Sequence, residues 1–520
     1  MIPGDAPPVS QHGSRISIDD LFRQIATRRP DALALADAAN RAAFTDGEPR
    51  RLTFAQADRL VSAIAGRLSR MGLPIDSIIG IQLPNIVESV LTILGILRAG
   101  MIPAPMPLLW RNADAVAAMA RAGAKALITC GRIGEYEHCR LATRVAADVF
   151  SIRYVCGFGS RLSDGVVPLD DLFTIERLEP IPLLNRDTNA AAHLAAITFE
   201  SGEDGPVPVA RRHLELLAGG MSVLAEARLA EGSRLLSTIA PSSFAGISLT
   251  LVPWLLTGGT LVLHHGFNAD LFAAQRQDEG CGTLVLPAPV VFRFAETGLF
   301  DVESPATVIA EWRAPDRLPA SLLWQGKQAA LVDVAVFGEA GFVATRRGDD
   351  GRPLPLPFGR VFSPREGAAA AAFVELKPSA MNTVALRGPM VPHHHFPPRV
   401  ENTELPHFAI GRDGYVDSGY ACRFDPVRQA LVVTGPPPGF ITVGGYRFPL
   451  QKLLETISKI DAEATLTAVP DPLVGHRLVG FARDPSAMRI ALSAFGLNPL
   501  IAAAFAEPGH EEVHKAAATG

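Results

Sequence analysis

The chain has 520 residues, 48% of them hydrophobic, and a formal net charge of -5 at pH 7. This length predicts more than one domain, and the weak charge excludes the basic surface that a nucleic-acid-binding protein needs. The scattered cysteines form no Cys-x-x-Cys pair, which argues against a disulfide framework or a zinc site. Because the N-terminus also lacks the apolar core of a secretory signal, these features predict a cytoplasmic protein.

Strand and helix patterns alternate along the first part of the chain. The sequence predicts an amphipathic helix over 52–72, a buried strand over 78–83, and a helix with Asn85 as its N-cap that ends at Gly100. A strand, a helix and a strand follow, over 101–106, 113–124 and 125–130. This alternation predicts an α/β domain with a mostly parallel sheet, because parallel strands require crossover connections.

The segment "ITFESGEDGPVPVARRHLELL" (197–217) has the build of a phosphate-binding loop. An apolar strand runs into Ser201, Gly202 and Gly205, and a helix follows. The turn nevertheless carries three carboxylates, on Glu200, Glu203 and Asp204, and no lysine follows it. A carboxylate about 5 Å from a phosphate costs roughly 3 kcal/mol at an effective dielectric near 20, so this turn is unsuited to a polyanion.

The longest stretch without Asp, Glu, Lys or Arg, 235–268, raises the question of a membrane span. Pro253 and the pair Gly258-Gly259 divide it into a helix-sized and a strand-sized piece. We therefore expect a buried helix followed by a strand, with a membrane span as the alternative.

The second part of the chain is richer in β patterns. Short β segments between turns predict a β-rich subdomain over about 345–433, within a large domain formed by 1–433. The prolines of "TGPPPGF" end regular structure and make 434–439 the predicted hinge. Residues 440–520 then predict a small, truncated α+β C-terminal domain with a disordered tail. The expected fold class is therefore α/β, with a large N-terminal domain and a small α+β C-terminal domain.

Several segments, taken in their order, resemble the adenylate-forming acyl-CoA synthetase family over residues 20–482. They are the helix at 52–72, "IGIQLPNIVESVLTILGILRAGMIPAPM", the glycine-rich loop, "FGEAG", "GRDGYVDSGYACRFD", and "ITVGGYRFPL" with the later "AVPDPLVGHRLVGFA". The resemblance implies parallel sheets with flanking helices, a small β subdomain and a C-terminal domain that rotates. It also implies an enzyme that joins a carboxylate to AMP from ATP with Mg²⁺ and then passes the acyl group to CoA.

The sequence departs from the family's pattern at the positions that serve ATP. The family's phosphate loop reads [TS]-S-G-T-T-G-x-P-K-G; Ser201, Gly202 and Gly205 match it, and the three carboxylates take the hydroxyl positions. Val207 stands at the lysine position, with one residue deleted, and the nearest cations are Arg211 and Arg212.

Further departures lie on other segments. By resemblance, Gly341 replaces a metal-holding glutamate, Tyr420 a ribose-binding aspartate and Pro436 a ribose-contacting arginine. The family's C-terminal catalytic lysine has no counterpart, since the last segment contains only Lys515 in an unmatched tail. No catalytic residue can therefore be assigned, CoA remains the cofactor to expect, and ATP with Mg²⁺ is disfavoured.

The resemblance still implies candidate ligand-binding residues. The cofactor-binding candidates are Ser201, Gly202, Gly205, Arg211, Arg212, Phe337, Gly338 and Arg447, and the substrate-pocket candidates are Phe244, Ala245, Gly246, Val336 and Phe337. Two alternatives stay open: a surface salt bridge for Arg447, and a filled core in place of the pocket. The histidines of "PHHHFPPR" (392–399) are expected in a solvated loop rather than at a metal.

Three functions are compatible with the sequence. The first is an acyl-CoA synthetase-like protein that has lost or weakened adenylation and keeps an acyl-, CoA-, carrier- or partner-binding role. The second is an active fatty-acid or aryl-acid CoA ligase in which Mg²⁺ reorganises the loop carboxylates with Arg211 and Arg212. The third is a structural subunit of an active homologue.

Overall fold

The computed structural model describes residues 16–174, 189–298, 300, 305–319, 321–325, 329–362 and 372–506. Most of the N-terminal stretch considered as a signal, and the tail with Lys515, lie outside the described residues.

A parallel sheet with the strand order β4-β3-β5-β6-β7 forms the first layer of the large domain. Its strands are β3 (Ile78–Gln82), β4 (Ile102–Pro105), β5 (Ala126–Cys130), β6 (Tyr154–Phe158) and β7 (Val167–Pro168). The helices that alternate with them or precede them are α1 (Ile18–Arg28), α2 (Arg41–Phe44), α3 (Phe54–Arg70), α4 (Val87–Arg98), α5 (Asn112–Ala122) and α6 (His138–Asp148). The predicted alternation and its helix and strand positions are confirmed.

A second sheet has the order β15-β14-β13-β12-β10-β11-β1-β2, parallel except for the pairs at its two edges. Its strands are β1 (Leu33–Ala36), β2 (Arg51–Thr53), β10 (Arg234–Ser237), β11 (Thr260–Leu263), β12 (Thr283–Pro287), β13 (Thr307–Trp312), β14 (Ala330–Val336) and β15 (Phe342–Arg346). The helices α7 (His213–Ala227), α10 (Ala269–Asp278) and α11 (Ala288–Glu296) accompany it. The central strands β11 and β13 are buried along their whole length and β12 along all but its last residue, as expected for a sheet covered on both faces.

The uncharged stretch at 235–268 lies in the core of this second layer. It forms α8 (Phe244–Gly246), the π-helical turn η3 (Ile247–Leu251), α9 (Val252–Thr257) and then β11. The expectation of a buried helix followed by a strand is confirmed. Within the described ranges, no helix combines the length and the apolar character that crossing a bilayer requires.

The predicted N-cap role of Asn85 is wrong. Helix α4 begins after Ile86 without a side-chain cap. The buried Asn85 amide instead donates hydrogen bonds to the carbonyl oxygens of Ser237 at 2.9 Å and His264 at 3.3 Å. Ser237 ends β10 and His264 directly follows β11, so the amide ties the loop after β3 of the first sheet to the second sheet.

The second part of the chain forms an antiparallel sheet and then the small domain. The sheet has the order β16-β21-β20-β19-β18-β17, with β16 (Leu356–Pro357), β17 (Gly359–Phe362), β18 (Ala372–Pro378), β19 (Thr383–Arg387), β20 (Val416–Asp425) and β21 (Ala430–Gly435). The small domain contains the hairpins β22 (Phe440–Val443) with β23 (Tyr446–Pro449) and β24 (Thr465–Asp471) with β25 (Gly475–Phe481). Its helices are α12 (Leu450–Ile460), α13 (Pro485–Ala494) and α14 (Pro499–Ala503). The predicted fold class is confirmed.

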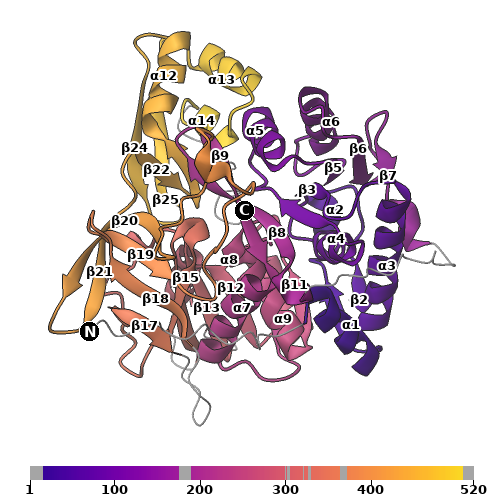
Figure 1. The fold of residues 1–520 in the computed structure, drawn as a ribbon, viewed down its shortest axis with the longest axis horizontal. Helices are drawn as coiled ribbons and strands as arrows, with labels where there is room; N and C mark the ends of the chain where they lie inside the picture. Colours follow the sequence, from indigo (N-terminus) through magenta and orange to yellow (C-terminus); the bar gives the residue numbers. More distant parts are fainter. Residues whose placement is uncertain are drawn as a thin grey trace, which may run out of the picture.

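The small domain packs against the large one beside α5 and a projecting hairpin that contains β9 (Gly205–Arg212), at the upper part of Figure 1. The Ala113 amide donates to the carbonyl oxygen of Gly496 at 3.1 Å, and the Leu109 amide donates to the Tyr446 hydroxyl at 3.1 Å. These bonds fix the small domain over the end of the first sheet.

The packing of the second layer can be tested by substitution of Gly259, which lies between α9 and β11. A Cβ there would lie 1.8 Å from the carbonyl oxygen of Ser233, so the strand would have to move. We expect Gly259→Ala to lower the free energy of unfolding by about 2 kcal/mol or more, measured by urea titration with circular dichroism. The exposed Gly282 has no atom within 4 Å of its added Cβ, so Gly282→Ala should leave stability almost unchanged. Equal losses in both variants would contradict this packing.

Candidate functional site

The segment predicted as a phosphate-binding loop is a closed β-hairpin. β8 (Leu194–Gly202) pairs with β9 up to the facing residues Gly202 and Gly205, which leaves only Glu203 and Asp204 at the tip. Gly205 has a φ of 98°, a conformation that suits the glycine of a tight hairpin turn. The predicted helix follows as α7, but only after the whole length of β9. Because the ladder continues to the tip, the segment forms no open cradle of amides.

Glu200, near the end of β8, holds a cation from the small domain. Its Oε1 accepts from the Arg447 guanidinium at 2.9 Å, and its Oε2 accepts from the Glu339 amide at 2.6 Å. Arg447 also donates to the Tyr420 hydroxyl at 3.0 Å, and that hydroxyl donates to the carbonyl oxygen of Arg313 at 3.2 Å. Five separate segments of the chain are therefore linked through this ion pair and its hydrogen bonds.

The environment of this pair favours charge on the guanidinium. Burial disfavours the charged form of Arg447, but the Glu200 carboxylate and the Tyr420 hydroxyl outweigh it and raise the Arg447 pKa above its ordinary value. Burial raises the Tyr420 pKa, so this phenol stays protonated. Gly338 has a φ of 58°, and a Cβ there would lie 2.1 Å from Glu200 Oε2, so glycine lets the carboxylate approach.

A second, weaker ion pair lies at the hairpin tip. The Lys452 ammonium of α12 is 2.9 Å from Asp204 Oδ1, and it lowers the pKa of that exposed carboxyl. Arg121 of α5 donates to the carbonyl oxygens of Asp204 at 2.8 Å and Pro206 at 2.7 Å. The Glu200–Arg447 and Asp204–Lys452 pairs therefore both join the hairpin to the small domain. The exposed Asp204–Lys452 pair adds little stability, because solvent screens it.

Arg211 and Arg212 do not lie near the hairpin tip. They end β9, roughly 20 Å of extended chain from Gly205. The Arg211 side chain is fully buried, donates to the carbonyl oxygen of Met390 at 3.2 Å, and pairs with Glu339 Oε2 at 3.3 Å. The Arg212 amide donates to the Glu215 carboxylate at the start of α7.

Glu339 completes this buried cluster. Its carboxylate accepts from the Thr198 hydroxyl at 2.5 Å and from the Phe244 amide at 3.2 Å. Burial raises the Glu339 pKa and lowers the Arg211 pKa, and the pairing of the two opposes both shifts. The Arg211 guanidinium also lies 4.0 Å from the centroid of the Phe244 ring. Two charges far apart in sequence thus neutralise each other beside the hairpin.

A cavity of about 170 Å³ lies between the hairpin, the second sheet and the small domain. Its apolar lining includes Trp110, Phe199, Ala245, Val336 and Phe448, and its polar lining includes Asp114, Glu200, Ser201, Ser242, Ser243, Glu339 and Arg447. Of the predicted residues, Ser201, Gly202, Gly205, Gly338, Arg447, Ala245 and Val336 line it. This arrangement suits a small molecule with an apolar body and one polar end.

The other predicted residues lie in the surrounding core. Phe244 is fully buried with its ring centroid 5.5 Å from that of Phe342, and Phe337 packs edge-on against Tyr420. A Cβ on Gly246 would lie 2.2 Å from the carbonyl oxygen of Ala240, so Gly246 serves a close backbone approach.

The sequence matches the family model of AMP-binding enzymes over residues 22–322, more than half of the chain. The chain belongs to the AMP-binding enzyme family. Among curated relatives it is 24% identical to 2-hydroxy-7-methoxy-5-methyl-1-naphthoate--CoA ligase of Streptomyces carzinostaticus, over 93% of this chain and 86% of that protein. It is 23% identical to medium-chain fatty-acid--CoA ligase of Escherichia coli, over 89% of this chain and 80% of that protein. Its relatives thus include ligases named for small aromatic and aliphatic acids.

Solved structures share the fold of this AMP-binding family member. The amide bond synthetase McbA from Marinactinospora thermotolerans superposes with a TM-score of 0.68 at 19% identity, covering 92% of this chain and 94% of that one. The o-succinylbenzoate CoA synthetase of Bacillus subtilis gives a TM-score of 0.67 at 15% identity, covering 92% of both chains. These likenesses confirm the large parallel-sheet domain and the small C-terminal domain.

The structure shows which contacts are made by the residues that depart from the motifs of the AMP-binding family. Val207 is buried on β9 opposite Glu200, and Tyr420 is buried in the network around Arg447. Gly341 has a φ of 149° and precedes β15. A Cβ added at this position would lie nearest to the side chains of Leu386 and Met390.

Pro436, at the position of the ribose-contacting arginine, lies between β21 and β22 and lines a second cavity.

The histidines at 393–395 were considered as metal ligands. The His393 ring lies 3.4 Å from Glu215, and the described residues contain no group of three or more side chains placed to hold a metal.

Sequence reasoning missed Glu339, Asp114 and Trp110. Glu339 occupies a variable position of the matched motif, and only its carboxylate beside an apolar strand signalled a buried partner. Asp114 and Trp110 follow β4 in the chain and carry no motif, so their presence in the cavity depends on tertiary packing.

Glu200→Gln should loosen the small domain. The substitution keeps the shape but removes the charge that neutralises Arg447, whose side chain is only 10% exposed. We expect the free energy of unfolding to fall by about 2 kcal/mol, and amide hydrogen exchange over 440–460 to accelerate. Glu203→Gln changes an exposed carboxylate of the same turn and should stay within about 0.5 kcal/mol of the wild type. Identical exchange rates in the two variants would contradict the role given to Glu200.

Asp114 should make stability pH-dependent. Burial raises its pKa from the ordinary 3.8 to about 7, with Arg111 opposing the shift. Between these values the folded chain holds a proton that the unfolded chain releases, so this carboxyl lowers stability as the pH rises. We expect the unfolding free energy of Asp114→Asn, relative to that of the wild type, to increase by roughly 2 kcal/mol as the pH rises from 5 to 8. The exposed variant Asp164→Asn should show no such gain, and parallel pH curves for Asp114→Asn and wild type would refute the assignment.

Proposed function

We propose that this chain is an acyl- or aryl-CoA ligase-like protein in which ATP-dependent adenylation is lost or strongly weakened. It keeps a role in binding an acyl or aryl carboxylate, a CoA thioester or a carrier protein. The observation that carries the proposal is the closed hairpin, whose Glu200 carboxylate is already neutralised by Arg447 at 2.9 Å. A triphosphate at this place would meet Glu200, Glu203 and Asp204 without a free cradle of amides.

The position of the nearby cations supports the proposal over a reorganised, active phosphate loop. Such a loop would need Arg211 and Arg212 near the tip, to share the charge with Mg²⁺. Arg211 is instead fully buried in its pair with Glu339, and moving it would leave an uncompensated carboxylate in the core. The cations that do lie near the hairpin are already engaged: Glu200 and Tyr420 bind Arg447, Asp204 binds Lys452, and Arg121 donates to two hairpin carbonyl oxygens.

The cavity supports a ligand with an apolar body. Trp110, Phe199 and Phe448 give it aromatic walls, and Ser242 and Ser243 offer hydroxyls to a polar end. Curated relatives are ligases named for a naphthoate and for medium-chain fatty acids, which supports the same class of acid or thioester. A structural neighbour is an artificially fused adenylation–PCP di-domain, which makes a carrier protein the partner to test.

Calorimetric titration with ATP and Mg²⁺, then with AMP and CoA, tests this function. We expect no heat of ATP binding up to about 1 mM with the wild type, and measurable heat with CoA. The closed hairpin offers the phosphates no free amides, and its nearby cations Arg447 and Lys452 are already paired with Glu200 and Asp204. Replacing Glu200, Glu203 and Asp204 together by threonine returns hydroxyls to the turn and should tighten ATP binding by about tenfold or more. Circular dichroism and cooperative thermal unfolding establish that each protein is folded.

Micromolar ATP binding by the wild type, or pyrophosphate release with any acid of a panel containing octanoate, salicylate and naphthoate, would contradict the loss of adenylation. If the folded wild type shows no heat of CoA binding, CoA is excluded as a ligand of the proposed binding role. The carboxylate and the carrier protein would then remain to be tested.

A further inference from the structure

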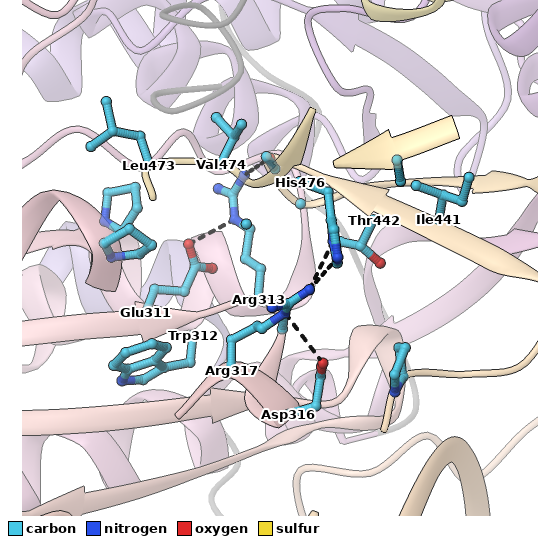
Figure 2. A pocket seen from close by; sticks show the side chains of 18 of the residues that line it. Glu311, Trp312, Arg313, Asp316, Arg317, Ile441, Thr442, Leu473, Val474 and His476 are labelled. Atoms are coloured by element: carbon cyan, nitrogen blue, oxygen red, sulfur yellow. Dashed lines mark hydrogen bonds and ion pairs between the residues drawn. The ribbon is translucent and has the colours of Figure 1, made fainter. Parts of the chain in front are cut away.

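The candidate cavity between the hairpin and the small domain is lined by more acids than cations. The charged side chains of its lining are Asp114, Glu200, Glu311, Glu339, Arg313 and Arg447. Arg447 pairs with Glu200 at 2.9 Å, and Arg313 pairs with Glu311 at 2.8 Å, a contact drawn as a dashed line in Figure 2. Both cations of the lining are therefore already neutralised by an acid.

Two acids of the lining remain after this pairing. Glu339 is neutralised by Arg211, which is buried outside the lining and lies 3.3 Å away. Asp114 forms no hydrogen bond or ion pair with any of the described residues. The Arg111 guanidinium acts on it only at longer range, since it donates to two backbone carbonyl oxygens and lies 3.8 Å from the centroid of the Tyr136 ring. Asp114 is thus the one acid of the lining without a partner in the described parts of the chain.

The Asp114 carboxylate is open to the cavity. The residue is half-buried, and its oxygens are not among the polar atoms that are shielded from solvent without a partner. Its place in the first turn of α5 favours a negative charge, but burial outweighs this and raises its pKa to about 7. A cationic group in the cavity would supply the counter-charge that the fold leaves out.

Aromatic side chains form walls of the same cavity. The rings of Trp110 and Phe199 meet edge-on with their centroids 5.5 Å apart, and Tyr446 and Phe448 of β23 add the small domain's side. The volume of about 170 Å³ is close to the roughly 150 Å³ that holds one benzene ring. Aromatic rings also attract cations. The lining therefore suits one ring, or a short apolar chain, that carries an ammonium group.

The neighbouring second cavity provides a contrast. It measures about 260 Å³ and shares Glu311, Arg313 and Gly445 with the candidate cavity (Figure 2). Its other acid, Asp316, pairs with Arg317 at 3.7 Å, so both acids of its lining have a cation partner. The unpaired acid is a property of the candidate cavity.

We propose that the ligand of the candidate cavity carries a protonated amino group that pairs with Asp114. Its apolar body lies against Trp110 and Phe199. This inference rests on the proposed function, because it takes the same cavity as the ligand site, and it narrows the acid or thioester bound there to an amino-substituted one. An anion without an amino group is disfavoured, because both cations of the lining are already paired.

Three ligands that share a phenyl ring and a two-carbon side chain test the inference on the full chain. Phenethylamine carries the positive charge, phenethyl alcohol is neutral and phenylacetate is negative. By calorimetry and ligand-observed NMR near about pH 7.5, we expect phenethylamine to bind with a dissociation constant of about 1 mM or below. The alcohol and phenylacetate should bind at least about fivefold more weakly, because neither can form the charged pair.

The affinity for the amine should rise with pH. An alkyl ammonium stays charged below about pH 9, so Asp114 is the partner whose charge changes between about pH 6 and pH 8. Of the groups around it, Arg111 stays charged, Tyr446 stays protonated because burial raises its pKa, and Glu200 and Arg447 stay paired. We expect about tenfold tighter binding of phenethylamine over this range and no change for the alcohol.

Two variants place the amine at Asp114. Asp114→Asn removes the charge at constant shape, so it should weaken phenethylamine binding at least about fivefold, leave the alcohol unchanged and abolish the pH dependence. Ala245→Val narrows the cavity and should weaken all three ligands. Asp164→Asn, at an exposed acid outside the lining, is the matched control and should bind as the wild type does. If Ala245→Val does not fold, the comparison of the two aspartate variants decides alone.

Four results would overturn the inference. They are the absence of phenethylamine binding, equal affinities for the amine and the alcohol, tighter binding of phenylacetate than of the amine, and an amine preference that survives in Asp114→Asn. Phenylacetate binding without an amine preference would overturn this inference and support the acid-binding role of the proposed function. ATP binding by the wild type would contradict the loss of adenylation and leave the amine preference standing.

Discussion

The ion pair between Glu200 and Arg447 is the contact on which the arrangement of the site depends. It joins the hairpin of the large domain to β23 of the small one, and Tyr420 and the Glu339 amide complete its hydrogen bonds. A half-buried carboxylate and guanidinium are stable only when such partners satisfy them. The pair therefore fixes the small domain over the hairpin.

The buried pair of Arg211 and Glu339 supplies the second constraint. It ties β9 to the turn after β14, directly beneath the hairpin, and Thr198 and the Phe244 amide satisfy the carboxylate. Separating two such charges costs several kcal/mol, because each would remain desolvated without its partner. The hairpin consequently has a rigid base, and its carboxylates are left to interact with the small domain.

The family and the order of the elements could be read from local patterns. The helix at 54–70 and the strand at 78–82 lie within the predicted ranges, because apolar periodicity reports which face is buried. Asn85 shows where this reasoning fails, since an asparagine before a helix is typical of an N-cap. Two buried carbonyl oxygens accept from its Nδ2 and hold the side chain in another orientation, and its Oδ1, the atom that would cap the helix, has no partner among the described residues. Such an orientation is decided by contacts far apart in sequence.

The sequence by itself determined that three carboxylates replace hydroxyls in the turn, that the loop is one residue short, and that the fold is α/β. Only the tertiary structure decided what those carboxylates bind. Ion pairing requires atoms within a few ångströms, and Glu200 and Arg447 are separated by 247 positions in the chain. The same holds for both cavities, whose walls combine distant segments, so their size and balance of charge arise only when the two domains pack together.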